Sequence, residues 1–321
     1  SLMTVSNVVN GRFRSMRPET RERVEKAISE LQYHPRGMAR SLRLNREFAV
    51  GLLIVDPTSS FLADPFTSQA VAGLSNYLGR HDYGCLVHGV IPNDFGKSIF
   101  LRDSRTAGLC VFLCGDPETR RGYLERLLAL RKPIIAIEDT WSSVYPDVAV
   151  VGQDDFGAAT AMTARMLAQG CREFHVLSPE TRWPSVDQRI EGMRVAIMQS
   201  RSDVCLEVTR CDETSVVRTE DALSRLAPRL GANACLVAAT DRLATAMSRL
   251  IRSGPRMFEP TLRYTCFGTS ETSRDLTVFS VVAQSDPHGI GAAAGRLLLD
   301  RIEQGHFATH EEKIPVRMLE R

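Results

Sequence analysis

The residue types that most often carry chemistry do not form a recognisable catalytic or metal-binding set in this sequence. Its 8 cysteines include no CxxC pair, and its 7 histidines are scattered over 321 residues. Cys110 and Cys114 lie in an apolar run, which is typical of buried, reduced thiols. GIGAAAG, residues 289–295, has the wrong spacing for a phosphate loop, and its small residues favour close helix packing. We therefore expect a binding protein and not an enzyme, with no cofactor and no metal.

Composition gives the broad class of protein. Hydrophobic residues make up 43% of the chain and charged residues 24%, as in ordinary globular proteins. No apolar run approaches the ~18 residues that span a bilayer, and the N-terminus shows no secretory pattern. The length suggests about two globular units. We expect a cytoplasmic protein that makes no membrane contact.

The charge of the chain is divided unevenly along its length. Residues 1–48 hold 10 basic and 5 acidic side chains, a formal charge of +5, while the remainder holds 30 basic and 33 acidic side chains, a charge of −3. A charge run is often only a solvated face. A basic head joined to a mildly acidic body nevertheless favours a polyanion-binding module attached to something else.

Short helices account for most of the head. TVSNVVNG, residues 4–11, has valines at helical spacing and closes with an Asn-Gly turn. RPETRERVEKAISEL, residues 17–31, predicts a helix with Pro18 in its first turn and one apolar stripe: Val24, Ala27, Ile28 and Leu31. Two such helices cannot bury both apolar stripes without a third partner. RGMARSLR, within residues 36–44, is a marginal helix that could fold on DNA or act as a flexible linker.

After residue 48 the chain alternates short apolar runs with helical patterns. We expect strands near 49–55, 84–90, 107–114, 133–138 and 148–151, and again in EFHVLS, CLEVTR, ACLVAA, RYTCFG and VFSVVA. Interleaved helices are expected near 155–169, 186–200, 216–229, 241–253 and 289–305. This alternation predicts an α/β body with two doubly wound parallel sheets. Two such halves resemble the two-lobed periplasmic-binding-protein type I fold, preceded here by an α-helical head.

The head carries a family resemblance. SLMTVSNVVNGR, then RPETRERVEKAISELQYHPRGMARSLR, resembles the DNA-binding head of lactose-repressor (LacI/GalR) regulators. In that family the recognition helix is the second helix of a helix-turn-helix. The resemblance therefore implies that the motif is truncated at its start, so that the chain binds DNA weakly. Ser1-Leu2 is either native or a cloning scar.

The resemblance also implies the DNA contacts. They are Leu2, Met3, Thr4, Ser6, Asn7, Asn10, Ala39, Arg40 and Leu42. Leu42 matches the hinge leucine that wedges into the minor groove, and Ala39 and Arg40 belong to the same hinge helix. Family members often carry Arg where Asn7 stands, so operator preference is expected to differ.

The implied domain organisation has two parts. Residues 1–47 form the partial helix-turn-helix head, with a hinge helix at about 36–44. Residues 48–321 form the effector-binding and dimerisation domain. Its N-lobe spans about 48–150 plus 285–311, and its C-lobe about 151–284 plus 312–321.

Motif matches in the body imply an effector site in the cleft between the lobes. Its residues are Phe66, Glu138, Trp183, Arg189, Thr240, Asp241 and Gln284. Gly268 stands where the family often has Asp, and Thr240 where it has Asn. A sugar is the family default. Losing that polar pair makes an acid derivative, a phosphorylated sugar or another small anion held by Arg189 more plausible.

These expectations describe a ligand-responsive transcriptional regulator, a repressor, that binds double-stranded, near-palindromic operator DNA. It would act as a homodimer or tetramer under the control of a sugar or related polar metabolite. Whether that metabolite is an inducer or a corepressor is open. The alternative is the solute-binding protein of a transporter, which shares the body fold but has no use for the hinge sequence MARSLR.

Overall fold

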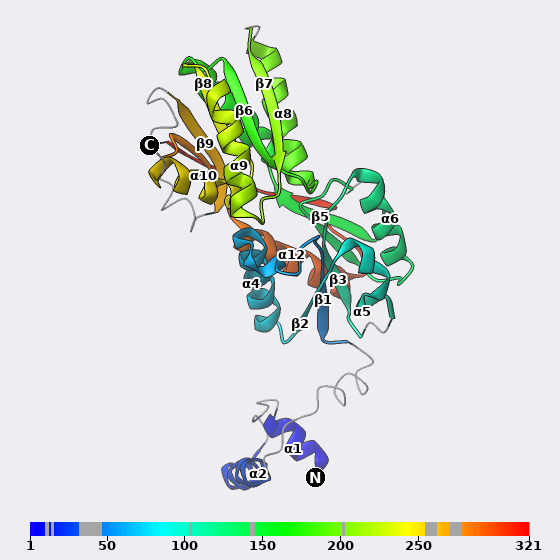
Figure 1. Ribbon diagram of the computed structural model, residues 1–321. Helices are drawn as coiled ribbons and strands as arrows, with labels where there is room; N and C mark the ends of the chain where they lie inside the picture. The colour runs from blue at the N-terminus through cyan, green and yellow to red at the C-terminus, as the bar shows by residue number, and fades with distance from the viewer. Residues whose placement is uncertain are drawn as a thin grey trace. The chain divides into compact units, whose positions relative to one another are not determined.

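The computed structural model describes residues 1–9, 13, 16–31, 47–102, 105–141, 145–200, 203–253, 262–269 and 278–320. The chain divides into two compact units, Ser1–Phe48 and Ala49–Arg321. Figure 1 draws both with their helices and strands labelled. Within the described ranges, no helix combines the length and the apolar character needed to cross a membrane.

Two helices make up the described part of the first unit. α1 spans Leu2–Val9, and the Ser1 hydroxyl accepts a hydrogen bond from the backbone N–H of Thr4 at 3.3 Å. α2 spans Pro18–Glu30 and starts at its proline, without a side-chain cap from Arg17. Both predicted helices are therefore present. The predicted hinge helix, together with Asn10, Ala39, Arg40 and Leu42, lies outside the described residues.

The second unit contains two six-stranded sheets. The first has the order β11-β5-β4-β3-β1-β2, and every pair in it is parallel. Its strands in chain order are β1 (Ala49–Val55), β2 (Gly84–Val90), β3 (Gly108–Leu113), β4 (Ile134–Ile137), β5 (Val148–Gln153) and β11 (Glu311–Ile314). We call this sheet and its helices the first lobe.

The second sheet has the order β12-β10-β9-β8-β6-β7. It is parallel except for β12, which pairs antiparallel with β10. Its strands in chain order are β6 (Glu173–Pro179), β7 (Cys205–Cys211), β8 (Ala234–Ala238), β9 (Arg263–Thr269), β10 (Val281–Ser285) and β12 (Arg317–Glu320). This sheet and its helices are the second lobe.

Helices cover both faces of each sheet, as parallel strands require. The first lobe carries α4 (Pro65–Arg80), α5 (Ile99–Arg102), α6 (Pro117–Leu128), α12 (Pro287–Gln304), and the 3₁₀ helices η1 (Phe61–Ala63) and η2 (Pro92–Lys97). The second lobe carries α7 (Asp155–Ala168), α8 (Pro184–Ser200), α9 (Val216–Leu226), η3 (Ala227–Arg229) and α10 (Asp241–Ser253). Figure 1 shows these layers in both lobes.

Each sheet has a separate apolar core on each face. In the first lobe, Leu74 of α4 packs with Leu52, while Leu124 of α6 packs with Leu53 on the opposite face. In the second lobe, α7 and α8 cover one face, and α9 and α10 cover the other. Neighbouring residues of one strand thus serve opposite cores, which confirms the predicted α/β class with two doubly wound sheets.

The glycine-rich segment 289–295 lies in α12 and packs tightly on α4. A Cβ added to Gly291 would lie 2.0 Å from the carbonyl oxygen of Ala70, and one added to Gly73 would lie 2.0 Å from that of His288. The two backbones approach closely because neither glycine has a side chain at the contact. The small residues therefore serve helix packing, as the sequence predicts.

The chain passes between the lobes at three places. It leaves the first sheet after Gln153, returns after Ser285, and crosses again between Ile314 and Arg317. The lobe boundaries expected at 150/151 and 311/312 fall inside β5 and β11, respectively. Three closely spaced connections suit two lobes that move relative to each other as rigid bodies.

Candidate effector-binding cleft

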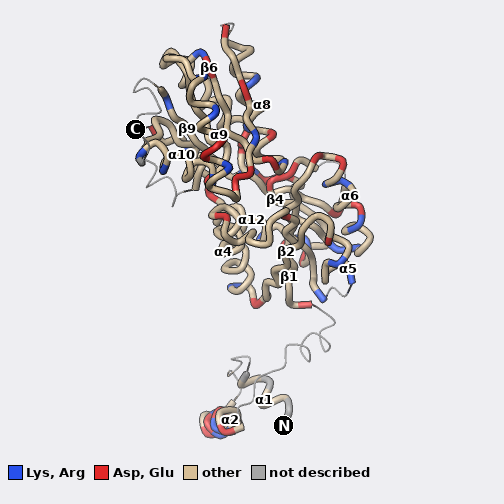
Figure 2. Tube along the Cα trace, in the orientation of Figure 1, with Lys and Arg blue, Asp and Glu red and all other residues tan. Residues whose placement is uncertain are grey.

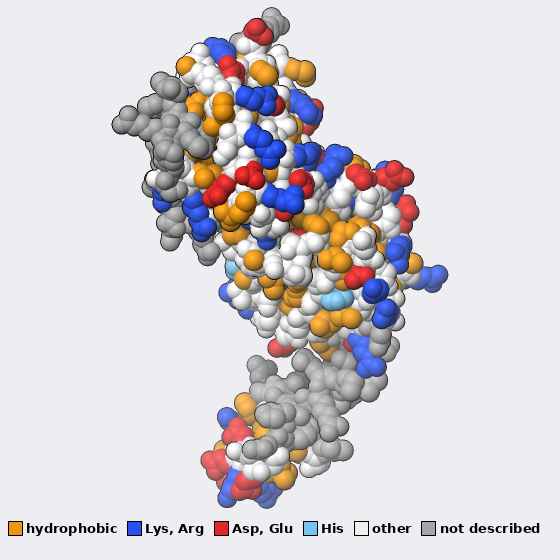
Figure 3. Space-filling model, viewed as in Figure 1, with side chains coloured by type: hydrophobic (Ala, Val, Ile, Leu, Met, Phe, Trp, Pro, Cys, Tyr) orange, Lys and Arg blue, Asp and Glu red, His pale blue; other side chains and the backbone are white. Residues whose placement is uncertain are grey.

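A cavity of about 350 Å³ lies between the lobes, at the carboxyl ends of the strands of both sheets. Asp56 follows β1, Glu138 follows β4, and Glu180 follows β6. Open α/β sheets generally bind ligands at this edge, and the volume suits a small molecule. Figure 3 shows acidic and basic side chains close together on one face where the lobes meet.

Six of the seven predicted effector residues line this cavity: Phe66, Glu138, Trp183, Arg189, Thr240 and Asp241. Gln284 is not among the lining residues, but the next residue, Ser285, is. Ser285 ends β10, and its hydroxyl donates to the carbonyl oxygen of Gly268 at 3.2 Å. Successive residues of a strand point to opposite faces of the sheet. Ser285 therefore faces the cavity, whereas its neighbour Gln284 does not line it.

Arg189 is held by groups of its own lobe. Its Nε donates to Asp155 Oδ1 at 2.6 Å, its Nη1 donates to the carbonyl oxygen of Ala239 at 2.6 Å, and its Cζ lies 4.6 Å from the centre of the Phe267 ring. The residue is 7% exposed. Its charge is thus compensated inside the protein, so the sequence-based idea of an anionic ligand held by Arg189 loses its main support.

Glu138 contacts the ion pair between Arg189 and Asp155. It follows β4 with a φ of 59°, and its Oε1 accepts a hydrogen bond from the backbone N–H of Gln153 at 3.1 Å. Burial raises the pKa of Glu138 well above its usual range, and the neighbouring Asp155 carboxylate, which shares a hydrogen bond with it, raises it further. Both effects favour the protonated form of Glu138, which can donate a hydrogen bond.

Thr240 and Asp241 begin α10. Asp241 Oδ1 accepts a hydrogen bond from the backbone N–H of Thr269 at 2.7 Å, which joins α10 to the end of β9. The Thr240 hydroxyl donates to Glu213 Oε2 at 2.5 Å and accepts from the N–H of Leu243 at 3.4 Å. Both residues thus hold the cleft wall in place while facing the cavity.

Several acidic lining residues were missed at the sequence level: Asp56, Asp64, Glu180, Asp212 and Glu213. The available signal was their position, because Asp56, Glu180 and Asp212 each directly follow a strand. With Glu138 and Asp241 they give seven carboxyl groups, against two arginines, Arg189 and Arg242. Figure 2 shows acidic positions along the trace where the lobes meet.

Three polar contacts join the lobes, two of them through Arg242. Arg242 Nε of the second lobe lies 3.7 Å from Asp64 Oδ1 of the first, and its Nη2 donates to the carbonyl oxygen of Ser60 at 3.5 Å. The backbone N–H of Gly115 donates to the carbonyl oxygen of Arg182 at 2.9 Å. A change in cleft occupancy would act directly on these contacts.

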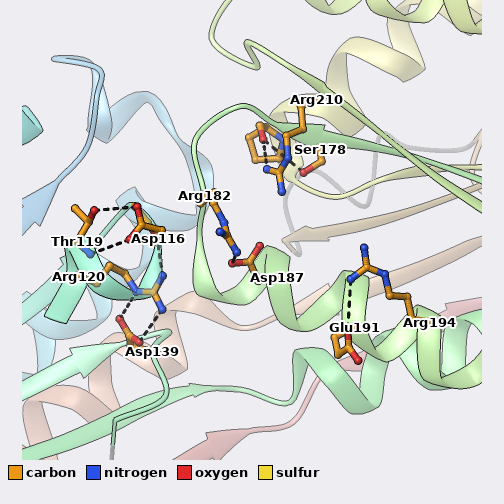
Figure 4. Close-up of polar contacts among 12 residues, drawn as sticks. Asp116, Thr119, Arg120, Asp139, Ser178, Arg182, Asp187, Glu191, Arg194 and Arg210 are labelled. Carbon is orange, nitrogen blue, oxygen red and sulfur yellow. Dashed lines mark hydrogen bonds and ion pairs between the residues drawn. The ribbon is translucent and has the colours of Figure 1, made fainter.

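A buried ion pair fixes the loop that carries Glu138. Arg120 Nε donates to Asp139 Oδ2 at 3.1 Å, and Arg120 Nη1 donates to the carbonyl oxygen of Gly115 at 2.7 Å (Figure 4). Burial raises the pKa of Asp139 to about 6, although the Arg120 guanidinium opposes the shift. On the other lobe, Arg182 donates to Asp187 at 2.9 Å near the start of α8.

The predicted DNA-contacting residues that the structure describes lie on α1. Met3 is 70% exposed, while Thr4 and Asn7 are partly exposed. Leu2 and Ser6 belong to the same helix. Among the described residues, no group of three or more His, Cys, Asp or Glu could hold a metal ion.

Comparison with known proteins finds relatives among bacterial transcriptional regulators. The model of the family described as bacterial regulatory proteins, lacI family, matches residues 1–36. The HTH-type transcriptional repressor PurR of Vibrio atlanticus (strain LGP32) is 25% identical over 325 residues, covering 98% of this chain and 91% of that protein. The head therefore matches the lacI family, and the similarity to a repressor extends over nearly the whole chain. Proteins of the lacI family are DNA-binding transcriptional regulators with an effector-binding domain, and they are not enzymes.

Solved lacI-family structures share the fold. The lac repressor dimer bound to operator and the anti-inducer ONPF has a TM-score of 0.80 at 18% identity, covering 100% of this chain and 94% of that one. The transcriptional regulator CelR in complex with cellobiose has a TM-score of 0.67 at 20% identity, covering 99% and 94%. The two-lobed body with its helical head is therefore a LacI-like fold.

Proposed function

We propose that this protein is a ligand-responsive repressor of the lacI family that binds a near-palindromic operator as a homodimer. A sugar or related polar metabolite in the cleft between the lobes would control that binding. The observation that carries the proposal is a cavity lined by both lobes and spanned by the Arg242–Asp64 ion pair, in a chain whose head matches the lacI family. The cytoplasm is the compartment in which such a repressor acts.

The predicted residues have defined roles in this proposal. Met3, Thr4 and Asn7 on the exposed side of α1 would meet base edges and phosphates in the major groove. Phe66 and Trp183 would pack on the effector, while Thr240, Asp241 and Glu138 would hydrogen-bond to it. Arg189 is given a supporting role, because Asp155 and Ala239 already accept hydrogen bonds from its Nε and Nη1.

Related proteins support each half of the proposal. The lac repressor has been solved as a dimer on its operator, and CelR with cellobiose. The transporter alternative shares only the body, and the family match at residues 1–36 speaks against it. Effector and operator must alter each other's affinity by the same factor, because the two binding free energies are coupled.

Selection of duplex DNA by the full chain tests the first half. A random duplex pool would be selected at about 50 mM salt, where phosphate contacts are strongest. We expect an enriched near-palindrome, and we expect Asn7→Ala to change the selected sequence while the control Glu19→Ala, at the start of α2, does not. Enrichment of an asymmetric sequence would contradict dimeric operator binding.

A further inference from the structure

One end of the cleft gathers three carboxyl groups from different elements. Asp56 follows β1, Asp64 precedes α4, and Glu213 follows β7 of the other lobe. Asp56 and Asp64 both act electrostatically on Glu213, and Asp64 acts on Asp56. All three line the same cavity, with two from the first lobe and one from the second, and they are close enough to interact electrostatically.

Asp56 gives the most direct indication that this end of the cleft binds a hydrogen-bond donor. The residue is 7% exposed and lines the cavity. Its Oδ1 accepts a hydrogen bond from the N–H of Thr58 at 2.7 Å, whereas its Oδ2 accepts none from the residues that the structure describes. Because the residue is largely buried and lines the cavity, a ligand there can supply the hydrogen-bond donor that Asp56 Oδ2 lacks among the described residues.

The protein itself supplies too little positive charge here. Arg242 is the cation that faces the three carboxyl groups, and its ion-pair contact is with Asp64 at 3.7 Å. In the described part of the chain, neither Asp56 nor Glu213 forms an ion pair, and the neighbouring Asp212 reaches Arg218 only at 4.0 Å. One guanidinium thus faces three carboxyl groups, or four with Asp212.

The titration behaviour agrees with this imbalance. Burial, with smaller contributions from Asp64 and Asp56, raises the pKa of Glu213 to about 7 against the opposing hydrogen bond from Thr240 and the charge of Arg242. Burial also raises the pKa of Asp56, and Asp64 adds to the shift. Protons can therefore take the place of a cation when none is bound.

We propose that the effector carries a cationic nitrogen, an amine, which binds between Asp56, Asp64 and Glu213. The inference rests on the proposed function, since it assigns a chemical class to the ligand of the same cleft. An ammonium group donates up to three hydrogen bonds, for which Asp56 and Glu213 each offer an oxygen without a donor among the described residues. Asp64 already accepts two hydrogen bonds from Thr67 and pairs with Arg242, so it would contribute chiefly its charge. A neutral polyol would leave the charges unbalanced, and an anion would be repelled.

Two matched ligand series test the charge requirement. The first is 1-amino-1-deoxysorbitol, sorbitol and gluconate; the second is putrescine, 1,4-butanediol and succinate. Within each series the carbon chain is the same length and only the charge differs. Thermal stability of the full chain would be measured at about pH 8, where the amines stay charged and Glu213 is ionised. We expect the cationic member to give the largest shift in at least one series.

Isosteric variants locate the effect. In Asp56→Asn/Glu213→Gln the preference for the amine over its neutral counterpart, expected to be at least about tenfold in Kd, should disappear. Glu180→Gln, which removes a charge from the same cleft outside the trio, should retain it. A neutral or anionic member that binds as well as the amine would overturn the inference and leave the cleft as an effector site.

If no probe binds, the stability of the unliganded protein tests the inference. If the trio lacks its cation, the double variant should be more stable than the parent at about pH 8, with the gain vanishing near pH 4.5, where carboxyl groups are protonated. Equal stability of the two proteins at both pH values would overturn the inference. If an amine binds but leaves operator affinity unchanged, the charge assignment stands and the regulator proposal fails.

Discussion

Arg242 of the second lobe lies 3.7 Å from Asp64 of the first, so an ion pair spans the cleft. Its side chains are 17% and 22% exposed. An ion pair with this much solvent contact contributes at most about 1 kcal/mol to folding. The pair also joins two lobes that are otherwise connected by three short chain segments. It should therefore limit the movement of one lobe against the other.

Arg242→Ala should therefore loosen the lobes with little loss of stability. We expect the free energy of unfolding to fall by less than about 1 kcal/mol, while small-angle X-ray scattering shows a larger radius of gyration. Arg218→Ala, whose parent side chain is 68% exposed and pairs weakly with Asp212, serves as the control and should change neither quantity. An unchanged radius in Arg242→Ala would show that the pair does not hold the lobes.

Arg189→Ala should be strongly destabilising, because it leaves the buried Asp155 carboxylate without its cation. Removing one partner of a buried pair costs about 3–5 kcal/mol, measurable by urea denaturation. Arg194→Ala on the same helix removes an exposed pair with Glu191 and should cost less than about 1 kcal/mol. Similar small losses in both variants would refute a structural role for Arg189.

Glu213→Gln should stabilise the unliganded protein at high pH. Folding raises the pKa of Glu213 from 4.5 to about 7, so the native state binds more protons than the unfolded state between those values. Stability is therefore lost as pH rises from 4.5 to 7, and the full penalty remains above 7. We expect the variant to gain roughly 2 kcal/mol at high pH, after discounting for partial solvent contact, and nothing near pH 4. A pH-independent difference would contradict this cause.

Gly291→Ala tests the contact between α12 and α4. The added methyl group would meet the backbone of Ala70, which can move only with its helix. We expect a loss of about 1–3 kcal/mol or more in thermal or urea unfolding. Gly122→Ala in α6 is the control, since nothing lies within 4 Å of its added Cβ. That variant should gain up to about 1 kcal/mol from helix propensity, and a loss as large as that of Gly291→Ala would count against the packing explanation.

The sequence predicted the body well because its strands are continuous apolar runs. Residues 49–55 and 84–90 coincide with β1 and β2. β11 and β12 were not predicted, since EEKI and RMLE are four residues each and carry charged side chains. Their pairing depends on β5 and β10, distant in the sequence, which local patterns do not report.

The sequence predicted which residues line the cleft better than it predicted the charge of the cleft. Motif spacing located Arg189, but its partner Asp155 lies 34 residues away and on another helix. Gln284 illustrates strand alternation, because one residue decides which side chain faces the cavity. The acidic character of the cleft arises only when both lobes bring their strand ends together, as with Asp56 and Glu213.

The most direct test of the account measures operator affinity with the cleft empty and filled. Fluorescence anisotropy would follow the full chain binding to the selected near-palindrome, alone and with a saturating amount of the amine that gives the largest thermal shift. We predict that the amine changes the Kd for DNA by about fivefold or more, and that Asp56→Asn/Glu213→Gln abolishes the change. An unchanged Kd in the parent chain, with the amine shown to be bound, would contradict the claim that this cleft controls DNA binding.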